Sequence, residues 1–293
     1  MWGKVIVGLF LALALGVGLI AALGIEAVGR QAIADDPSSD TVATFDEVAS
    51  AHDALFGAHV HEDGVDWAAM GADPAAVRAL GALYARSGPT SGSSGATSGD
   101  GALAFRLDAY VALVALAIVE QSAARGGSLA SVHDVHGVLD PGDGFGFFTA
   151  QVFVLDRSLT NLEDLERTIL QRGDPRVLGL LHDGQRSSPL PLSRAIREET
   201  LEAELAAAAT RITAPPFVVI DDDAQTITLH PLYELHRTRI EAHARTVARL
   251  PTVAAWITHH AAPAIGEAVS RADAAGYTIR HASVDRTLSQ SSR

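Results

Sequence analysis

The chain of 293 residues contains no cysteine. This absence excludes disulfide bonds, thiolate metal sites, a lipid-modified cysteine anchor and a cysteine nucleophile. It leaves the compartment open, because exported proteins can fold without disulfides. The sequence also lacks HExxH, the metal-binding pair of many metalloproteases, and GxSxG, the nucleophile elbow of many serine hydrolases.

Basic residues are also few. There are 22 Lys and Arg against 35 Asp and Glu, which gives a formal net charge of −13. Because such a surface repels nucleic acid and anionic lipid head groups, we expect no nucleic-acid partner. Hydrophobic residues make up 48% of the chain, which is enough for a folded core and argues against disorder throughout.

A long apolar run begins at Val5. Val5–Ile25 comprises 21 residues, which as a helix would span about 31 Å and match a hydrocarbon core of roughly 30 Å. Lys4 precedes the run and acidic residues follow it, an arrangement that keeps the N-terminus in the cytoplasm. We therefore predict a signal-anchor at residues 1–30, a stalk at 31–43, and a single-pass protein of the cell membrane whose remaining chain lies outside the cytoplasm.

A cleaved signal peptide is the alternative interpretation of this segment. Ala32-Ile33-Ala34 matches an A-x-A cleavage site before Asp35, and cleavage there would give a secreted or periplasmic protein. The apolar core of a signal peptide usually has about 7–15 residues, so the length of the run favours the anchor. The membrane, contacted through this N-terminal helix, is the one partner that the sequence predicts.

Apolar periodicity and capping residues predict a helix-rich domain over residues 44–290. The predicted helix starts are the capping boxes Thr44–Glu47 and Thr160–Glu163, the pair Asp73-Pro74, and Thr200. Ala104–Val119 is strongly apolar, but it is short for a membrane span and Arg106 and Asp108 interrupt it. We expect this segment to be a buried core helix.

Short strands are predicted in the second half of the chain. Phe217–Ile220 and Thr226–Leu229 flank Asp221–Asp223 as a β-hairpin, and Tyr277–Arg280 is a further strand. The apolar Val177–Leu181 is interpreted as another. Ser87–Gly101, nearly all Ser, Gly, Thr and Ala, indicates a flexible loop inserted within one domain. The predicted fold class is α+β, a helix-rich single domain with a small β-sheet.

Five segments carry a resemblance to a known family. They are His59–Trp67, Ala104–Ala112, Ser158–Leu170, Asp174–Pro189 and Asp285–Ser289. In order and spacing they resemble the domain-of-unknown-function 547 family, whose second, fourth and fifth segments read roughly A-F-W-I-N-A-Y-N-A, N-C-G-A-R-S-S-P and D-W-S-L-N. The resemblance covers residue 44 to about residue 290 and implies a loose relationship to papain-like or transglutaminase-like folds. The family name records that its function is not settled.

The chain departs from the family pattern at polar positions. Asp108 and Val111 stand where the family has two Asn, and His182-Asp183 replace its Asn-Cys pair. If the family uses that Cys as a nucleophile, this chain has no thiol to take its place. The resemblance therefore implies a divergent copy that is either catalytically silent or uses its pocket only for binding.

Candidate functional residues gather in the fourth segment. His182 and Asp183 follow the predicted strand at Val177–Leu181, and Ser187 and Ser188 lie a few residues on, so a Ser-His-Asp hydrolase site can be drawn. Members of such triads normally come from separate elements, which speaks against it. The other two interpretations are a polar loop that caps backbone groups and a ligand-binding loop.

Four further residues are candidates for ligand binding or for structural pairing. Arg176 and Arg186 flank the loop and either hold a ligand carboxylate together or each pair with a nearby acidic side chain. Asp108 and Tyr110 either line the same pocket, or Asp108 is a buried partner of one of these arginines.

Histidine pairs do not support a metal site. His133 with His136 could share a helix face, and His59 with His61 a strand face. Neither pair has a third ligand at a recognised spacing, so we predict no metal and no cofactor.

Two functions compete on these grounds. The leading hypothesis is a membrane-anchored binding or scaffold domain without thiol catalysis, with a small-molecule or protein partner that the sequence does not identify. The alternative is an exported hydrolase or transferase. Its pocket would be formed by Asp108, Tyr110, His182, Asp183 and Ser187. In that enzyme the five side chains should converge around an open cleft.

Overall fold

A computed structural model describes residues 42–92, 99–136 and 145–292 of the chain. These residues form many helices and three small sheets, so the helix-rich α+β fold class is confirmed. The predicted signal-anchor at 1–30, the cleavage site after Ala34 and most of the stalk lie outside the described residues. So does the centre of the Ser87–Gly101 segment.

The first half of the fold is built around α5 (Gly99–Ala124). Four helices pack against it, namely α2 (Phe45–His59), α3 (Trp67–Ala72), α4 (Pro74–Arg86) and α7 (Leu162–Leu170). In the described part of the chain, α5 alone is long and apolar enough to cross a membrane, but 94% of its most apolar stretch is buried within the protein. The predicted buried core helix is therefore confirmed, and it extends beyond Ala104–Val119 at both ends.

Two of the four predicted helix starts, at Thr44 and Asp73, are capped as expected, while the Thr200 side chain makes no capping hydrogen bond to the helix that follows it. At α2 the Thr44 side chain accepts a hydrogen bond from the Glu47 N–H, and the Glu47 side chain accepts one from the Thr44 N–H, as predicted. Asp73 caps α4, with Pro74 in its first position. α7 begins one residue later than expected, because Asn161 rather than Thr160 caps it by accepting the Asp164 N–H.

The strands form two hairpins and one mixed sheet. The hairpins pair β1 (Val60–His61) with β2 (Gly64–Val65), and β3 (Phe153–Leu155) with β4 (Ser158–Thr160). β5 (Val218–Asp221) and β6 (Thr226–Leu229) form the predicted antiparallel hairpin. The predicted last strand, β7 (Thr278–His281), joins β6 in parallel.

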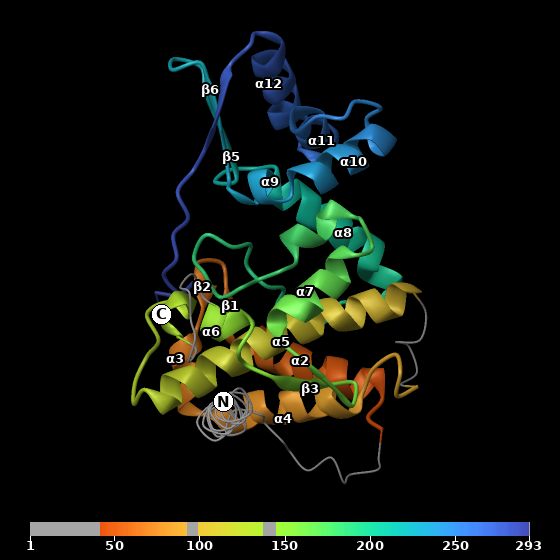
Figure 1. Cartoon of the computed structure of the whole chain (residues 1–293), viewed down its shortest axis with the longest axis vertical. Coiled ribbons are helices and arrows are strands. Elements are labelled where there is room, and N and C mark those ends of the chain that lie inside the picture. The colour runs from red at the N-terminus through yellow and green to blue at the C-terminus, as the bar shows by residue number, and fades with distance from the viewer. Residues whose placement is uncertain (1–41, 93–98, 137–144, 293) are drawn as a thin grey trace, which may run out of the picture.

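The second half of the fold lies along the long axis from the first (Figure 1). It contains α8 (Leu201–Ile212), α9 (Leu232–Leu235), α10 (Arg237–Val247), α11 (Val253–His260), α12 (Pro263–Ala274) and the β5–β6–β7 sheet. Short helical turns complete the chain: η1 (Val132–Asp134), α6 (Phe145–Phe148), η2 (Pro175–Gly179) and η3 (Glu198–Thr200). One apolar core cluster includes residues from both halves.

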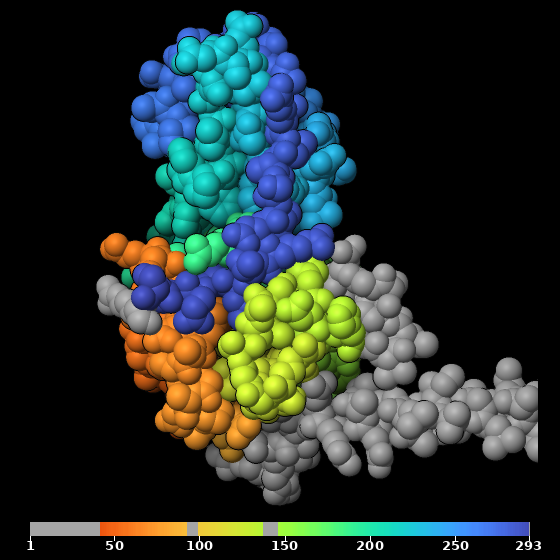
Figure 2. Space-filling model, turned by 90° about the vertical axis from the view of Figure 1, so that its left-hand side faces the viewer, coloured from red at the N-terminus to blue at the C-terminus, as the bar shows by residue number. Residues whose placement is uncertain are grey.

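The C-terminal tail joins the two halves on the outside. After β7 it returns across the surface to the first half, where Figure 2 shows it as a dark blue band. There the Val65 N–H donates to the Ser289 carbonyl (2.7 Å) and the Arg186 N–H donates to the Thr287 carbonyl (2.7 Å). The tail thus holds two of the family-like segments together.

One local prediction is wrong. Val177–Leu181 is not a strand, because η2 begins at Pro175 and Asp174 caps it by accepting the Arg176 N–H. In this helical turn the backbone of Gly179 lies close to α8. A Cβ at this position would approach the Ala208 carbonyl oxygen to 2.6 Å.

The Ser87–Gly101 segment is more ordered at both ends than a flexible loop. Its last residues, from Gly99, belong to α5. Its first residues are anchored to the β3–β4 turn, where the Asp156 carboxylate accepts the N–H groups of Thr90 (2.7 Å) and Ser91 (2.8 Å).

Candidate functional site

A cleft of about 590 Å³ lies where both halves of the fold meet. Its wall combines residues of α5, α7, the segment after η2, the segment around α9 and the C-terminal tail. Its apolar members include Phe148, Leu178, Leu181, Pro189, Leu232 and Val284. Its polar members include Tyr110, Glu166, Asp183, Gln185, Ser187 and His230. A mostly apolar wall with a few polar groups is typical of a small-molecule site.

Four of these residues form what we call the polar cluster: Tyr110, Glu166, Asp183 and Gln185. Asp183 accepts hydrogen bonds from the Gln185 N–H (2.9 Å) and from its side-chain Nε2 (2.7 Å). The Gln185 Oε1 is buried and accepts no hydrogen bond. The Tyr110 side chain is 1% exposed, and its hydroxyl has no partner in the described part of the chain. Two polar groups of the cluster are therefore left for something else to bind.

Glu166 is the third unpaired group of the cluster. No described residue forms a hydrogen bond or an ion pair with its carboxyl group. The pKa of Glu166 is raised to about 7, chiefly by burial and then by the negative charges of Asp183 and Glu163, while the Arg239 guanidinium lowers it. Burial, with the charges of Glu166 and Asp183, also raises the pKa of Tyr110 well above its ordinary value. Glu166 therefore changes charge near neutral pH inside a cleft, a signature common at functional sites.

The remaining titratable residues make the cleft acidic. Glu166, Asp183 and Glu234 contribute three carboxyl groups, and the described lining residues include no Lys or Arg. Burial lowers the pKa of His230 below its ordinary value, and burial with the charge of Arg239 lowers that of His236 to about 4. Both histidines are therefore neutral at neutral pH, and no fixed positive charge lines the cleft.

His182 lies behind the cleft instead of facing it. Its ring is 0% exposed and stacks on Trp67 at 5.9 Å between ring centroids. Nδ1 lies 2.9 Å from the Pro189 carbonyl oxygen, which can only accept, so Nδ1 carries the proton and Nε2 accepts from the Ser289 hydroxyl (3.0 Å). Burial lowers the pKa of His182, which keeps this ring neutral. The ring joins buried segments and has no face left for a substrate.

Ser187 and Ser188 line the cleft. They do not form the Ser-His-Asp triad that the sequence allowed, because neither hydroxyl can pass its proton to His182. The Ser187 hydroxyl donates to the Asp285 carbonyl (3.0 Å) and has no contact with His182. The Ser188 hydroxyl, which lies 2.9 Å from His182 Nδ1, donates to the Gln185 carbonyl (2.8 Å). Because Nδ1 is itself a donor here, His182 cannot accept a proton from Ser188 at that nitrogen.

Asp108 occupies a different environment from Tyr110. Its carboxyl group is buried and accepts the Ile196 N–H at 2.8 Å, and Asp108 does not line the cleft. Burial raises the pKa of Asp108 well above its ordinary value, against the effect of this hydrogen bond. Asp108 therefore pairs with the backbone, and neither Arg176 nor Arg186 is its partner.

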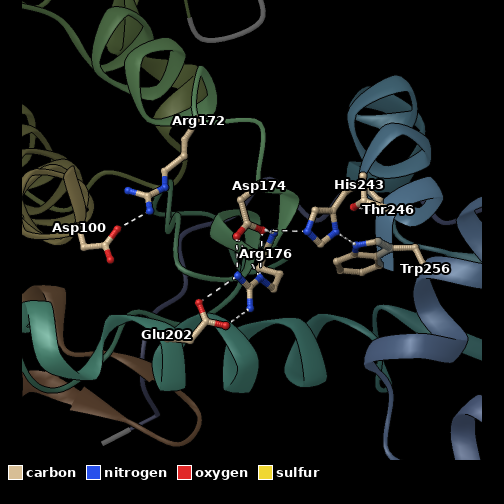
Figure 3. Close-up of polar contacts among 8 residues, drawn as sticks. All are labelled: Asp100, Arg172, Asp174, Arg176, Glu202, His243, Thr246 and Trp256. Atoms are coloured by element: carbon tan, nitrogen blue, oxygen red, sulfur yellow. Dashed lines mark hydrogen bonds and ion pairs between the residues drawn. The ribbon is translucent and has the colours of Figure 1, made fainter. Parts of the chain in front are cut away.

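The two arginines of the loop also lie outside the lining of the cleft. Figure 3 shows Arg176 between Asp174 and Glu202, with contacts of 2.7 Å and 2.6 Å. Asp174 lies 3.9 Å from His243, which accepts the indole N–H of Trp256 (3.1 Å). This network connects η2 to α8, α10 and α11. Arg176 therefore pairs with acidic side chains of the fold and not with a ligand in the cleft. Arg186 is exposed, and its backbone N–H binds the tail.

The histidine pairs do not form metal sites in the structure. His59 ends α2 while His61 lies in β1, and His136 lies beyond the end of η1. Across residues 42–92, 99–136 and 145–292, no group of three or more His, Cys, Asp or Glu side chains is arranged to hold a metal ion.

Sequence reasoning missed Glu166, His230 and the unpaired oxygen of Gln185. Glu166 carried a usable signal, because it lies four residues after Leu162 and three before Ile169, within the apolar stripe of α7. A carboxyl group at such a position faces the core or a cavity. His230 had no comparable signal, since it directly follows the short strand β6.

Three of the family-like segments meet around His182. Trp67 stacks on its ring, Ser188 and Pro189 contact Nδ1, and Ser289 contacts Nε2. Gly184, with φ of +89°, lies so close to α5 that a Cβ there would approach Ile118 to 2.8 Å, so this position requires glycine. Comparisons with protein-family models, with curated proteins and with solved structures find no match to this chain, and the family resemblance stays a prediction.

Proposed function

We propose that this chain is a membrane-anchored binding protein, related to the domain-of-unknown-function 547 family, whose cleft holds a small molecule outside the cytoplasm. The observation that carries this proposal is a set of polar groups without a hydrogen-bond partner among the described residues, which line the cleft beside apolar side chains: the Tyr110 hydroxyl, the Glu166 carboxyl and the Gln185 Oε1. Of these three groups, the Gln185 Oε1 is a buried atom without a partner, and such a group costs about 1–3 kcal/mol. A ligand that bonds to these groups would recover much of that cost.

The apolar part of the wall supports the same function. Leu178 and Leu181 are buried in the protein, while Leu235 at the cleft is 79% exposed and Val284 is 38% exposed. Apolar side chains around an open cleft gain stability when a ligand removes them from water, at about 25 cal/mol for each Å². The cleft is therefore suited to a ligand with an apolar body and a few polar atoms.

The environments of the candidate nucleophiles and of His182 favour binding over nucleophilic catalysis. The chain has no cysteine, His182 is enclosed by hydrogen bonds, and the Ser187 hydroxyl donates to a backbone carbonyl. A serine nucleophile needs a base that accepts its proton, and among the residues that the structure describes the Ser187 hydroxyl donates only to the Asp285 backbone carbonyl.

The experiment is a ligand-observed NMR screen of small amphipathic molecules against the full chain in lipid nanodiscs. Val284→Trp should fill the cleft from its partly exposed rim and abolish binding. Val219→Trp is the matched control, because Val219 is 42% exposed on β5 and does not line the cleft. Hits that bind the parent and Val219→Trp but not Val284→Trp support the proposal. A complete absence of hits, or hits that Val284→Trp retains, contradicts it.

The anchor is tested by membrane fractionation. We expect the full chain to stay with the membrane through high-salt and carbonate washes, and a chain without residues 1–30 to be released. The physical reason is the apolar run Val5–Ile25, which is long enough to span the bilayer. Recovery of a mature form that begins at Asp35 would establish cleavage in place of the anchor.

One observation favours a second candidate, an acid–base hydrolase or transferase that uses the same cleft. Glu166 has a pKa of about 7 beside the Tyr110 hydroxyl, which suits a general acid or base at neutral pH. In that case a hit from the screen should be converted to product, and for a neutral hit Glu166→Gln should abolish turnover while leaving binding intact. Hits that remain chemically unchanged after prolonged incubation argue for binding alone.

A further inference from the structure

We infer that the polar cluster selects ligands that carry a primary ammonium group on an apolar body, and this inference rests on the proposed binding function of the cleft. The charge of the cleft favours a cation. Three carboxyl groups line the cleft, contributed by Glu166, Asp183 and Glu234, and the lining residues that the structure describes include no Lys or Arg. A carboxylate or phosphate ligand would meet only like charges there.

The unpaired hydrogen-bonding atoms of the cluster favour the same head group. An ammonium group has three donors and no acceptor. The cluster offers oxygen atoms that no described residue uses, on Glu166, on the Tyr110 hydroxyl and on the buried Gln185 Oε1. Gln185 cannot turn its amide to relieve this without breaking the 2.7 Å hydrogen bond from Nε2 to Asp183. The unpaired oxygen atoms of the polar cluster thus match the three donors of an ammonium group, while a hydroxyl ligand could satisfy fewer of them; the unpaired Nε2 of His230, a donor that also lines the cleft, lies outside this cluster.

The surroundings of Glu166 give the selection a pH dependence. Four charged or titratable groups face it: Tyr110 from α5, Glu163 from α7 itself, Asp183 from the loop after η2, and Arg239 from α10. Arg239 donates to the Leu170 carbonyl and does not line the cleft, so it weakens the negative potential without occupying the site. At pH 7 about half of the Glu166 carboxyl groups carry a proton, since the pKa is about 7.

A bound ammonium ion favours the charged carboxylate, so binding should release this proton. We expect release of about half a proton per ligand at pH 7 and tighter binding of the ammonium ligand as the pH rises from 6 to 8. The affinity of a neutral ligand should be flat or fall over the same range. Proton release therefore distinguishes an ammonium that binds at Glu166 from one that merely enters an acidic cleft.

The test uses three probes that differ only in their head group: n-hexylammonium, n-hexanol and n-hexanoate. Each is titrated by calorimetry into the full chain in nanodiscs, in two buffers of different ionisation enthalpy, with Val284→Trp in the same nanodiscs to subtract lipid partitioning. We expect hexylammonium to bind at least tenfold more tightly than hexanol, and hexanoate not to bind. Glu166→Gln should reduce the hexylammonium affinity at least tenfold and leave hexanol unchanged.

Two further variants complete the design. Glu199→Gln removes the same charge from an exposed position and should change nothing. Tyr110→Phe keeps the ring that packs in the core and removes only the unpaired hydroxyl, so it should weaken hexylammonium binding several-fold. It tests the inference independently if Glu166→Gln does not fold. If hexanol binds as tightly as hexylammonium and Val284→Trp abolishes both, the ammonium inference is overturned and the binding function stands. If none of the three probes binds and the NMR screen gives no hits, the binding function itself is overturned.

Discussion

Replacing Glu166 by Gln should stabilise the protein at alkaline pH. In the folded chain burial raises the pKa of this carboxyl from its ordinary 4.5 to about 7. Between pH 4.5 and pH 7, the folded state therefore holds a proton on Glu166 that the unfolded chain has already released. Stability that is present below pH 4.5 is lost as the pH rises through 7, and Gln, which never ionises, avoids this loss.

The size of the effect follows from the two pKa values. A tenfold change in proton affinity corresponds to about 1.4 kcal/mol, so a rise from 4.5 to about 7 is worth about 3 kcal/mol once Glu166 is fully ionised. Part of this loss has already occurred at pH 5. Between pH 5 and pH 8 the advantage of Gln should therefore grow by about 2–3 kcal/mol.

The assay is urea unfolding at pH 5, 6, 7 and 8, followed by the fluorescence of the buried Trp67 and Trp256. The parent chain, Glu166→Gln and Glu199→Gln are compared at each pH, so that all other titrating groups cancel in the difference. Glu199 is exposed and reports the effect of net charge alone. Parallel stability curves for the parent and Glu166→Gln across this range would refute the assignment of Glu166 as a buried carboxyl that titrates near neutral pH.

Three stability predictions concern the supports of the cleft, all measured by urea unfolding at pH 7. Trp67→Ala should destabilise the chain by about 3–5 kcal/mol, since Trp67 is 5% exposed and stacks on His182; a loss below 1 kcal/mol would contradict that packing. Ser289→Ala should cost about 1–2 kcal/mol, because it leaves the buried His182 Nε2 without a donor, and Ser289→Thr should recover part of it. Arg176→Met should cost about 2 kcal/mol by leaving Asp174 unpaired, whereas Glu202→Gln, whose side chain is 77% exposed, should cost less than about 1 kcal/mol. Equal losses for the last two variants would count against the Asp174–Arg176 pair as the centre of the network.

Local signals predicted much of the secondary structure. The capping residues Thr44 and Asp73 set the starts of α2 and α4 because the interactions involved span only a few residues. The apolar composition of Ala104–Val119 predicted a core helix because burial on all sides requires such a sequence. The strand prediction for Val177–Leu181 was wrong because Asp174-Pro175 starts a helical turn. The close packing of Gly179 on α8 is in addition a long-range contact, which a local sequence pattern cannot predict.

The candidate site was predicted in part, for a geometric reason. Tyr110, Asp183 and Ser187 line the cleft, while Asp108 and His182 lie elsewhere. Residues two apart on a helix point in nearly opposite directions, so Asp108 and Tyr110 of α5 could not share a pocket. His182 and Asp183 are likewise adjacent in the chain but directed to the core and to the cleft, respectively. Sequence proximity therefore grouped residues that the backbone separates.

The central claim is that the cleft binds a ligand through the polar cluster, and a crystal structure of the chain with n-hexylammonium tests it most directly. We expect the nitrogen to lie within about 3 Å of a Glu166 carboxylate oxygen, with the alkyl chain against Leu181 and Leu232. A hexylammonium bound in the reverse orientation, or found only outside the cleft, would contradict the claim.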